Sequence, residues 1–138
     1  MIADRPIGVL GGGLIGQSWA SLFAAQGARV IVVDSAPGAD AAMAAFVQAA
    51  WPDLCTLGLA QGEAPVIAVS DDINALQGVQ FVQENLPDRI DIKHREIARL
   101  EGVIGADTII ASSSSSLKLP GTVKSISVAD ALTVISTV

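Results

Sequence analysis

The sequence predicts a single α/β domain of the doubly wound type, with a mostly parallel sheet. Short runs rich in β-branched residues alternate with longer segments of helical periodicity, which is typical of βαβ units. A Gly-rich turn separates the first of these runs from the first helical segment. The 138 residues have the size of one domain, so we expect residues 1–138 to fold as one unit.

Six short segments are predicted to be strands because they are apolar or β-branched and are bounded by turn-forming residues. The hydrophobic content of 51% agrees with this prediction, since strands of a parallel sheet are buried on both faces. The strands are expected at residues 6–10, 29–33, 66–69, 79–83, 108–111 and 132–135.

Helical patterns fill the intervals between these strands. In the first helix, Ile15, Trp19 and Leu22 share one face, and Gly27 follows as a stop signal. The second helix is rich in alanine and is expected to end before Pro52. The helices are predicted over residues 14–26, 39–50 and 88–101, with a short helix opened by Asp71 and Asp72.

The last of these helices is the most polar one. Ile90, Ile97 and Leu100 lie on one side of it and charged residues elsewhere, so we expect one face to cover the sheet. His94, the only histidine of the chain, lies among the charges and is expected at the surface.

Composition excludes several classes of partner. Eight Lys and Arg against fourteen Asp and Glu give a net charge of −6, which opposes binding to nucleic acid. No apolar run is long enough to cross a bilayer, so no membrane partner is expected. Cys55 is the single cysteine and belongs to no Cys/His cluster with zinc spacing, which favours a reducing, cytoplasmic setting and no metal site.

The turn after the first strand carries a G-x-G-x-x-G pattern made by Gly11, Gly13 and Gly16. In a Rossmann-type domain the first glycine permits the tight turn, the second admits a pyrophosphate, and the third lets the helix pack on the strand. The backbone N–H groups that begin the helix, including those of Leu14 and Ile15, would then face the phosphates. The pattern predicts a dinucleotide site, although it is also compatible with a simple turn.

Asp34 strengthens this interpretation, because it ends the second predicted strand, eighteen residues after Gly16. A carboxylate there can accept hydrogen bonds from both ribose hydroxyls of the adenosine. The alternative is a helix cap or a solvated turn carboxylate. Residues 35–38 offer no cation for a 2′-phosphate, so the predicted cofactor is NAD and not NADP.

Three blocks of the chain resemble the 3-hydroxyacyl-CoA dehydrogenase superfamily. The first is IGVLGGGLIGQSWASLFAAQGARVIVVD, in which GQSWASLF is similar to the branch of carnitine dehydrogenase and lambda-crystallin (gulonate dehydrogenase). The second is FVQENLPDRIDIKHREI, and the third is IIASSSSSL. The likeness extends to about Leu119.

The resemblance implies roles for residues of the second and third blocks. Glu84 would contact the nicotinamide-side ribose, and Lys93 would lie near the cofactor or the substrate. Ser115 would contact the substrate hydroxyl as the catalytic-site residue, and Ser113, which replaces an asparagine of the family, would border the cofactor. The alternatives are a surface carboxylate for Glu84, a solvated charge for Lys93, and a flexible linker for residues 112–116.

The chain departs from the family where a proton acceptor is needed. Oxidising a secondary alcohol requires a group that takes the hydroxyl proton while a hydride leaves. The family uses a histidine at the position that Ser136 occupies here. The family's C-terminal helical domain, which completes the substrate site and dimerises, is also absent from residues 1–138.

Three hypotheses follow. The chain is the NAD-binding part of a 3-hydroxy-acid dehydrogenase, which oxidises a 3-hydroxyl to a ketone, or it is a non-catalytic NAD-binding module, or it is a structural protein that keeps the fold. The first is preferred, with a homodimer as the assembly that the resemblance implies. The substrate would be a small 3-hydroxy acid such as carnitine or a sugar acid, with a 3-hydroxyacyl-CoA as the second choice.

Overall fold

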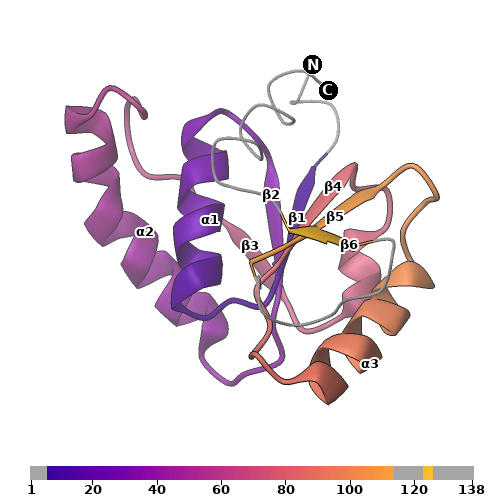
Figure 1. The fold of residues 1–138 in the computed structure, drawn as a ribbon. Coiled ribbons are helices and arrows are strands. Elements are labelled where there is room, and N and C mark those ends of the chain that lie inside the picture. The colour runs from indigo at the N-terminus through magenta and orange to yellow at the C-terminus, as the bar shows by residue number, and fades with distance from the viewer. Residues whose placement is uncertain (1–5, 114–122, 126–138) are drawn as a thin grey trace.

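A computed structural model describes residues 6–113 and 123–125. Strands and helices alternate along this part of the chain, as the sequence predicts (Figure 1). In chain order the elements are β1 (Ile7–Leu10), α1 (Leu14–Ala25), β2 (Val30–Val33), α2 (Ala39–Thr56), β3 (Ala68–Ser70), the short 3-10 helix η2 (Ile73–Leu76), β4 (Phe81–Glu84), α3 (Ile90–Glu101), β5 (Ile109–Ser112) and β6 (Val123–Ser125).

The sheet has the strand order β3-β2-β1-β4-β5-β6, and each neighbouring pair is parallel. The predicted doubly wound α/β fold is therefore confirmed. The order changes direction between β1 and β4, which is the point where such sheets bind ligands. The register aligns Leu10 with Val33 on one side and with Glu84 on the other, and Glu84 with Ser112. Residues that follow these four positions meet at one edge.

Helices cover both faces of the sheet. Figure 1 shows α1 and α2 on one side and α3 on the other. The core under α1 and α2 contains Trp19, Phe23 and Val47, together with Ile7 of β1. The second core lies under η2 and α3 and contains Leu76 and Leu100, among others. Strand β1 is buried on both faces of the sheet, which explains why its sequence contains no polar side chain.

Helix α1 has the predicted bounds within one residue, but its buried face is shifted. The buried apolar side chains are Trp19, Ala20 and Phe23, whereas Ile15 is 57% exposed. The prediction that Ile15 shares the buried face is wrong, because the first turn of α1 borders the crevice described below. The ring centroids of Trp19 and Phe23 lie 5.3 Å apart, so the turn of α1 between these two residues packs into the core.

Helix α2 was predicted to end before Pro52, and this prediction is wrong. The helix runs through Pro52 and ends at Thr56. Met43, Val47 and Trp51 form one buried stripe along it. The indole Nε1 of Trp51 donates to the carbonyl oxygen of Gly62 at 3.2 Å. Tertiary packing therefore overrides the local penalty of a proline inside a helix.

The short helix after β3 begins as predicted. The carboxylate of Asp72 accepts a hydrogen bond from the backbone N–H of Asn74 at 2.9 Å, so Asp72 is the N-cap of η2. The sixth strand is β6, at Val123–Ser125, pairing with β5. The strand predicted at residues 132–135 lies outside the described residues.

Helix α3 buries a different set of residues from the predicted one. Ile97 and Leu100 are fully buried, but Ile90 is 40% exposed. The third buried position is Lys93, one turn before Ile97. The apolar pattern alone misses this residue, because Lys93 is charged. Its side chain is nevertheless buried, and its charge is paired with Glu84.

Candidate functional site

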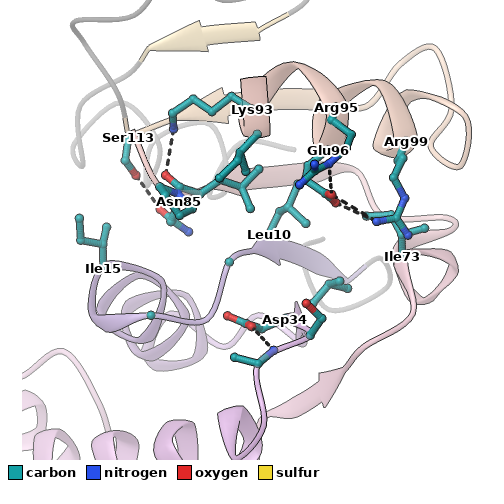
Figure 2. A pocket seen from close by; sticks show the side chains of 18 of the residues that line it. Leu10, Ile15, Asp34, Ile73, Asn85, Lys93, Arg95, Glu96, Arg99 and Ser113 are labelled. Carbon is teal, nitrogen blue, oxygen red and sulfur yellow. Dashed lines mark hydrogen bonds and ion pairs between the residues drawn. The ribbon is translucent and has the colours of Figure 1, made fainter. Parts of the chain in front are cut away.

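A crevice of about 820 Å³ opens at the carboxyl ends of the parallel strands, a volume typical of ligand sites (Figure 2). Residues that follow four strands line it: Gly11 after β1, Asp34 after β2, Asn85 after β4 and Ser113 after β5. Helix α3 supplies the opposite wall. The crevice thus lies where the strand order reverses, as expected for a doubly wound fold.

The three glycines of the turn have separate roles in the structure. Gly11 adopts φ +98°, and a Cβ there would lie 2.9 Å from the carbonyl oxygen of Asn85. A Cβ at Gly16 would collide with the carbonyl oxygen of Gly11, so the helix packs on the turn only with glycine at this position. A Cβ at Gly13 would meet nothing within 4 Å of the protein and would occupy the space of the crevice instead. These spaces fit the predicted pyrophosphate site.

The beginning of α1 presents free backbone donors to the crevice. No side chain caps this end, and its first turn holds no acidic residue. Leu14 and Ile15 line the crevice and are 69% and 57% exposed. The first N–H groups of a helix lack partners within the helix and carry the positive end of its dipole. This helix end therefore suits an anion such as a pyrophosphate.

Asp34 lies across the crevice floor and holds the glycine turn. One oxygen, Oδ2, accepts a hydrogen bond from the N–H of Gly12 at 2.6 Å, and Oδ1 accepts one from the N–H of Ala36 at 2.7 Å. The side chain is half-buried and lines the crevice. A carboxylate has about four acceptor sites, so two remain for hydroxyl groups of a ligand.

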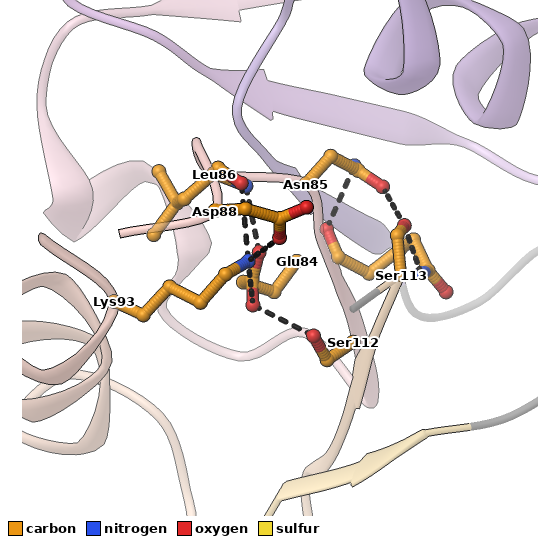
Figure 3. Close-up of polar contacts among 8 residues, drawn as sticks. Glu84, Asn85, Leu86, Asp88, Lys93, Ser112 and Ser113 are labelled. Atoms are coloured by element: carbon orange, nitrogen blue, oxygen red, sulfur yellow. Dashed lines mark hydrogen bonds and ion pairs between the residues drawn. The ribbon is translucent and has the colours of Figure 1, made fainter. Parts of the chain in front are cut away.

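Glu84 and Lys93 form a buried ion pair beside the crevice (Figure 3). Their side chains are 0% and 1% exposed, and the lysine Nζ lies 2.8 Å from Oε2 of the glutamate. The alternatives of a surface carboxylate and a solvated charge are therefore wrong, because α3 turns Lys93 toward the end of β4. Lys93 borders the crevice. A contact between Glu84 and a ribose stays a prediction.

The serine segment begins inside the fold. Ser112 ends β5 and is fully buried, and its hydroxyl donates to Glu84 Oε1 at 2.8 Å. The N–H of Ser113 donates to the carbonyl oxygen of Glu84 at 3.0 Å, and its side chain faces the crevice. A flexible linker is therefore wrong for these two residues. Ser115 lies outside the described residues.

Two arginines of α3 line the crevice and escaped the sequence analysis. Arg95 and Arg99 lie on the wall opposite Asp34, and both contact Glu96, at 3.3 Å and 3.0 Å (Figure 2). Nothing in the local pattern distinguishes them from other exposed charges of α3. His94 is exposed, as predicted, and is not among the residues that line the crevice.

Asn85 and Asp88, in the segment between β4 and α3, also line the crevice and were not predicted. Asn85 Oδ1 accepts a hydrogen bond from the hydroxyl of Ser113 at 2.6 Å. Asp88 lies at the rim, 69% exposed, with Oδ1 3.6 Å from Lys93 Nζ. Their place in the segment that follows a strand of the parallel sheet was the available signal.

The fold and this crevice define a dinucleotide-binding domain. A family model described as "3-hydroxyacyl-CoA dehydrogenase, NAD binding domain" matches residues 6–135. The chain belongs to this family, and NAD is its cofactor. Among the described residues, no helix combines the length and the hydropathy that a bilayer-spanning segment requires.

Curated relatives include enzymes that act on carnitine. The L-carnitine dehydrogenase of Streptomyces coelicolor is 38% identical over 113 residues, which cover 80% of this chain and 36% of that enzyme. The L-carnitine dehydrogenase of Streptomyces griseus is 40% identical over 113 residues, covering 80% of this chain and 34% of that enzyme. The chain thus spans about a third of the length of these relatives.

Solved structures of dehydrogenases share the fold. The NAD+-dependent 5-formyl-3-hydroxy-2-methylpyridine 4-carboxylic acid 5-dehydrogenase superposes with a TM-score of 0.74 at 36% identity, covering 85% of this chain and 38% of that one. The (S)-3-hydroxybutyryl-CoA dehydrogenase of Ralstonia eutropha gives a TM-score of 0.71 at 27% identity, covering 82% and 42%.

Proposed function

We propose that the crevice holds NAD in one extended orientation. The pyrophosphate lies over Gly13 and receives hydrogen bonds from the backbone at Leu14 and Ile15, while Gly11 and Gly16 keep the turn closed. The adenosine ribose lies at Asp34, and the nicotinamide lies toward Ser113 and the wall that carries Lys93. The observation that carries this proposal is the shared crevice of the uncapped α1 end and the Asp34 carboxylate.

The proposed reaction is oxidation of the 3-hydroxyl of a small 3-hydroxy acid to a ketone. Carnitine is the preferred substrate because L-carnitine dehydrogenases are 32–40% identical to this chain, and a sugar acid is the next choice. A 3-hydroxyacyl-CoA is the second class. NAD supplies the hydride acceptor when bound. A homodimer in a reducing, cytoplasmic setting is part of the same proposal.

In this proposal the described residues of the crevice bind and orient the cofactor and the substrate. Ser113 and Asn85 present polar groups at the nicotinamide end, and Ser115 is proposed to hold the substrate hydroxyl. The only histidine, His94, is exposed on α3 and does not line the crevice. A second candidate function, an NAD-binding module without turnover, is favoured by this placement of His94.

Two measurements test the proposal. Calorimetric titration of the chain with millimolar NAD should show saturable binding, and absence of binding would contradict the cofactor site. The intact native protein should then reduce NAD faster with L-carnitine than with gulonate or 3-hydroxybutyryl-CoA. The rate of reduction is measured by the absorbance of the reduced nicotinamide. Binding without turnover of any of the three would favour the non-catalytic module.

A further inference from the structure

Both backbone polar groups of Gly12, in the glycine turn between β1 and α1, are bound by side chains of other elements. Its N–H donates to Asp34 Oδ2, after β2, at 2.6 Å. Its carbonyl oxygen accepts a hydrogen bond from the side-chain amide Nε2 of Gln17, in the first turn of α1, at 3.0 Å. Neither Gly12 nor Gln17 is among the described residues that line the crevice. The contact from Gln17 therefore holds the turn from behind.

The bond from Gln17 sets the direction of the next backbone donor. The carbonyl of Gly12 and the N–H of Gly13 belong to one planar trans peptide, so they point in opposite directions. Gly13 is exposed and lines the crevice. Within residues 6–113 and 123–125, no acceptor receives a hydrogen bond from the Gly13 N–H. With the carbonyl turned to Gln17, this N–H is a donor left for a ligand.

The peptide between Gly12 and Gly13 is easy to turn over, because it has a glycine on each side. Glycine has no Cβ and adopts negative and positive φ values about equally well. The reversed peptide would present the Gly12 carbonyl oxygen to the crevice in place of the Gly13 N–H. This oxygen carries a partial negative charge and repels phosphate groups. The hydrogen bond from Gln17 thus selects the orientation that suits an anion.

The alternative is that Gln17 is an ordinary helix residue, since glutamine has a high helix propensity. Its side chain is half-buried, however, and its amide reaches back to a carbonyl five residues earlier. Ordering a long side chain costs conformational entropy that a solvated glutamine would keep. Only the nitrogen of the amide can donate to a carbonyl, so the contact also fixes which way the amide faces.

We propose that Gln17 is a positioning residue of the phosphate subsite: its amide holds the Gly12 carbonyl away from the crevice, so that the N–H of Gly13 faces the pyrophosphate, and Gln17 itself does not touch the cofactor. This inference rests on the proposed binding of NAD in the crevice. If the Gly12–Gly13 peptide kept this orientation only a tenth of the time, the apparent Kd for NAD would rise about tenfold.

The test compares wild type with Gln17→Met. Methionine has nearly the length and the helix propensity of glutamine but no N–H donor in its side chain. Gln48→Met, the same change at an exposed position of α2, is the matched control. Each protein is titrated calorimetrically with NAD, ADP and adenosine. ADP and adenosine share the base and the ribose, and of these two only ADP carries phosphates.

We expect Gln17→Met to raise the Kd for NAD and for ADP about tenfold. The Kd for adenosine should stay unchanged, because adenosine has no phosphate to meet the donors of the turn. Gln48→Met should alter none of the three values. An equal loss for ADP and adenosine would mean that Gln17 supports the crevice as a whole, which would overturn the proposal. Unchanged binding of NAD and ADP would overturn it as well.

The wild-type protein gives a second readout that does not depend on the folding of Gln17→Met. Inorganic pyrophosphate is added to the isotope-labelled protein, and the amide signals are followed by NMR. The backbone signal of Gly13 should shift more than the side-chain amide signal of Gln17. A larger shift at the Gln17 side chain would indicate direct contact and refute the positioning role, and so would an unchanged Gly13 signal. Wild-type protein that binds no NAD would defeat the proposed function, while the pyrophosphate titration still decides whether Gly13 receives a diphosphate.

Discussion

Asp34 Oδ2 accepts a hydrogen bond from the backbone N–H of Gly12 at 2.6 Å, although the two residues are 22 positions apart. This bond joins the end of β2 to the turn after β1. The carboxylate expected to bind a ribose therefore also fixes the turn expected to bind the pyrophosphate. The two halves of the proposed cofactor site are coupled by one side chain.

Asp34→Ala should weaken NAD binding by an order of magnitude or more. The change removes a charged acceptor, and hydrogen bonds to charged groups contribute about 1.5–3 kcal/mol each. Calorimetric titration with NAD measures the loss. Asp40→Ala, which removes an exposed carboxylate from the first turn of α2, is the control and should leave the affinity unchanged. Equal affinities for wild type and the Asp34 variant would remove Asp34 from the site.

Two glycine variants should separate folding from binding. Gly13→Ala adds a methyl group that meets no protein atom within 4 Å, so the thermal midpoint should change little while NAD binding is impaired. Gly16→Ala places a Cβ against the carbonyl oxygen of Gly11 and should destabilise the fold by about 1–3 kcal/mol. Thermal unfolding and NAD titration measure both. The same loss of stability in the two variants would contradict the assigned roles.

Pro52→Ala should stabilise the protein. Proline costs about 3 kcal/mol relative to alanine inside a helix, and its restriction of the unfolded chain offsets up to about 1 kcal/mol of this. The midpoint of thermal unfolding should therefore rise by roughly 4–12 °C. Pro65→Ala, outside the helices, is the control and should give no increase. A lower midpoint for Pro52→Ala would mean that α2 does not continue through this position.

The cap of η2 should depend on pH. Hydrogen bonds from Asn74, first from its backbone N–H and then from its side chain, hold the pKa of Asp72 below its ordinary value of 3.8. A carboxyl with a lowered pKa in the folded state stabilises the fold above pH 3.8, and this contribution is lost as the pH falls through the lowered value. Urea unfolding should show Asp72→Ala less stable than wild type at pH 7, with the difference shrinking toward acid pH. The exposed Asp71→Ala is the control, and a difference independent of pH would exclude the carboxylate as the cap.

Local pattern was sufficient for most elements and for half of the site. The alternation of apolar runs and helical periods predicts β1, α1, β2 and their order, because these signals depend on neighbouring residues. The meeting of Gly11, Gly13 and Asp34 at one crevice follows from spacing, since carboxyl ends of adjacent parallel strands always meet at one edge. Sequence by itself determined the fold class, the family and the cofactor.

Tertiary structure alone decided the features that depend on distant contacts. The burial of Lys93, the course of α2 through Pro52 and the place of Arg95 and Arg99 on the crevice wall each depend on how a helix lies against the sheet. Periodicity treats Lys93 as one more solvated charge of α3. Its partner Glu84 comes from β4, nine residues earlier, and only packing brings the two charges together away from water. The physical reason is that burial is a property of the assembled layers, whereas a sequence pattern reports the preferences of one segment.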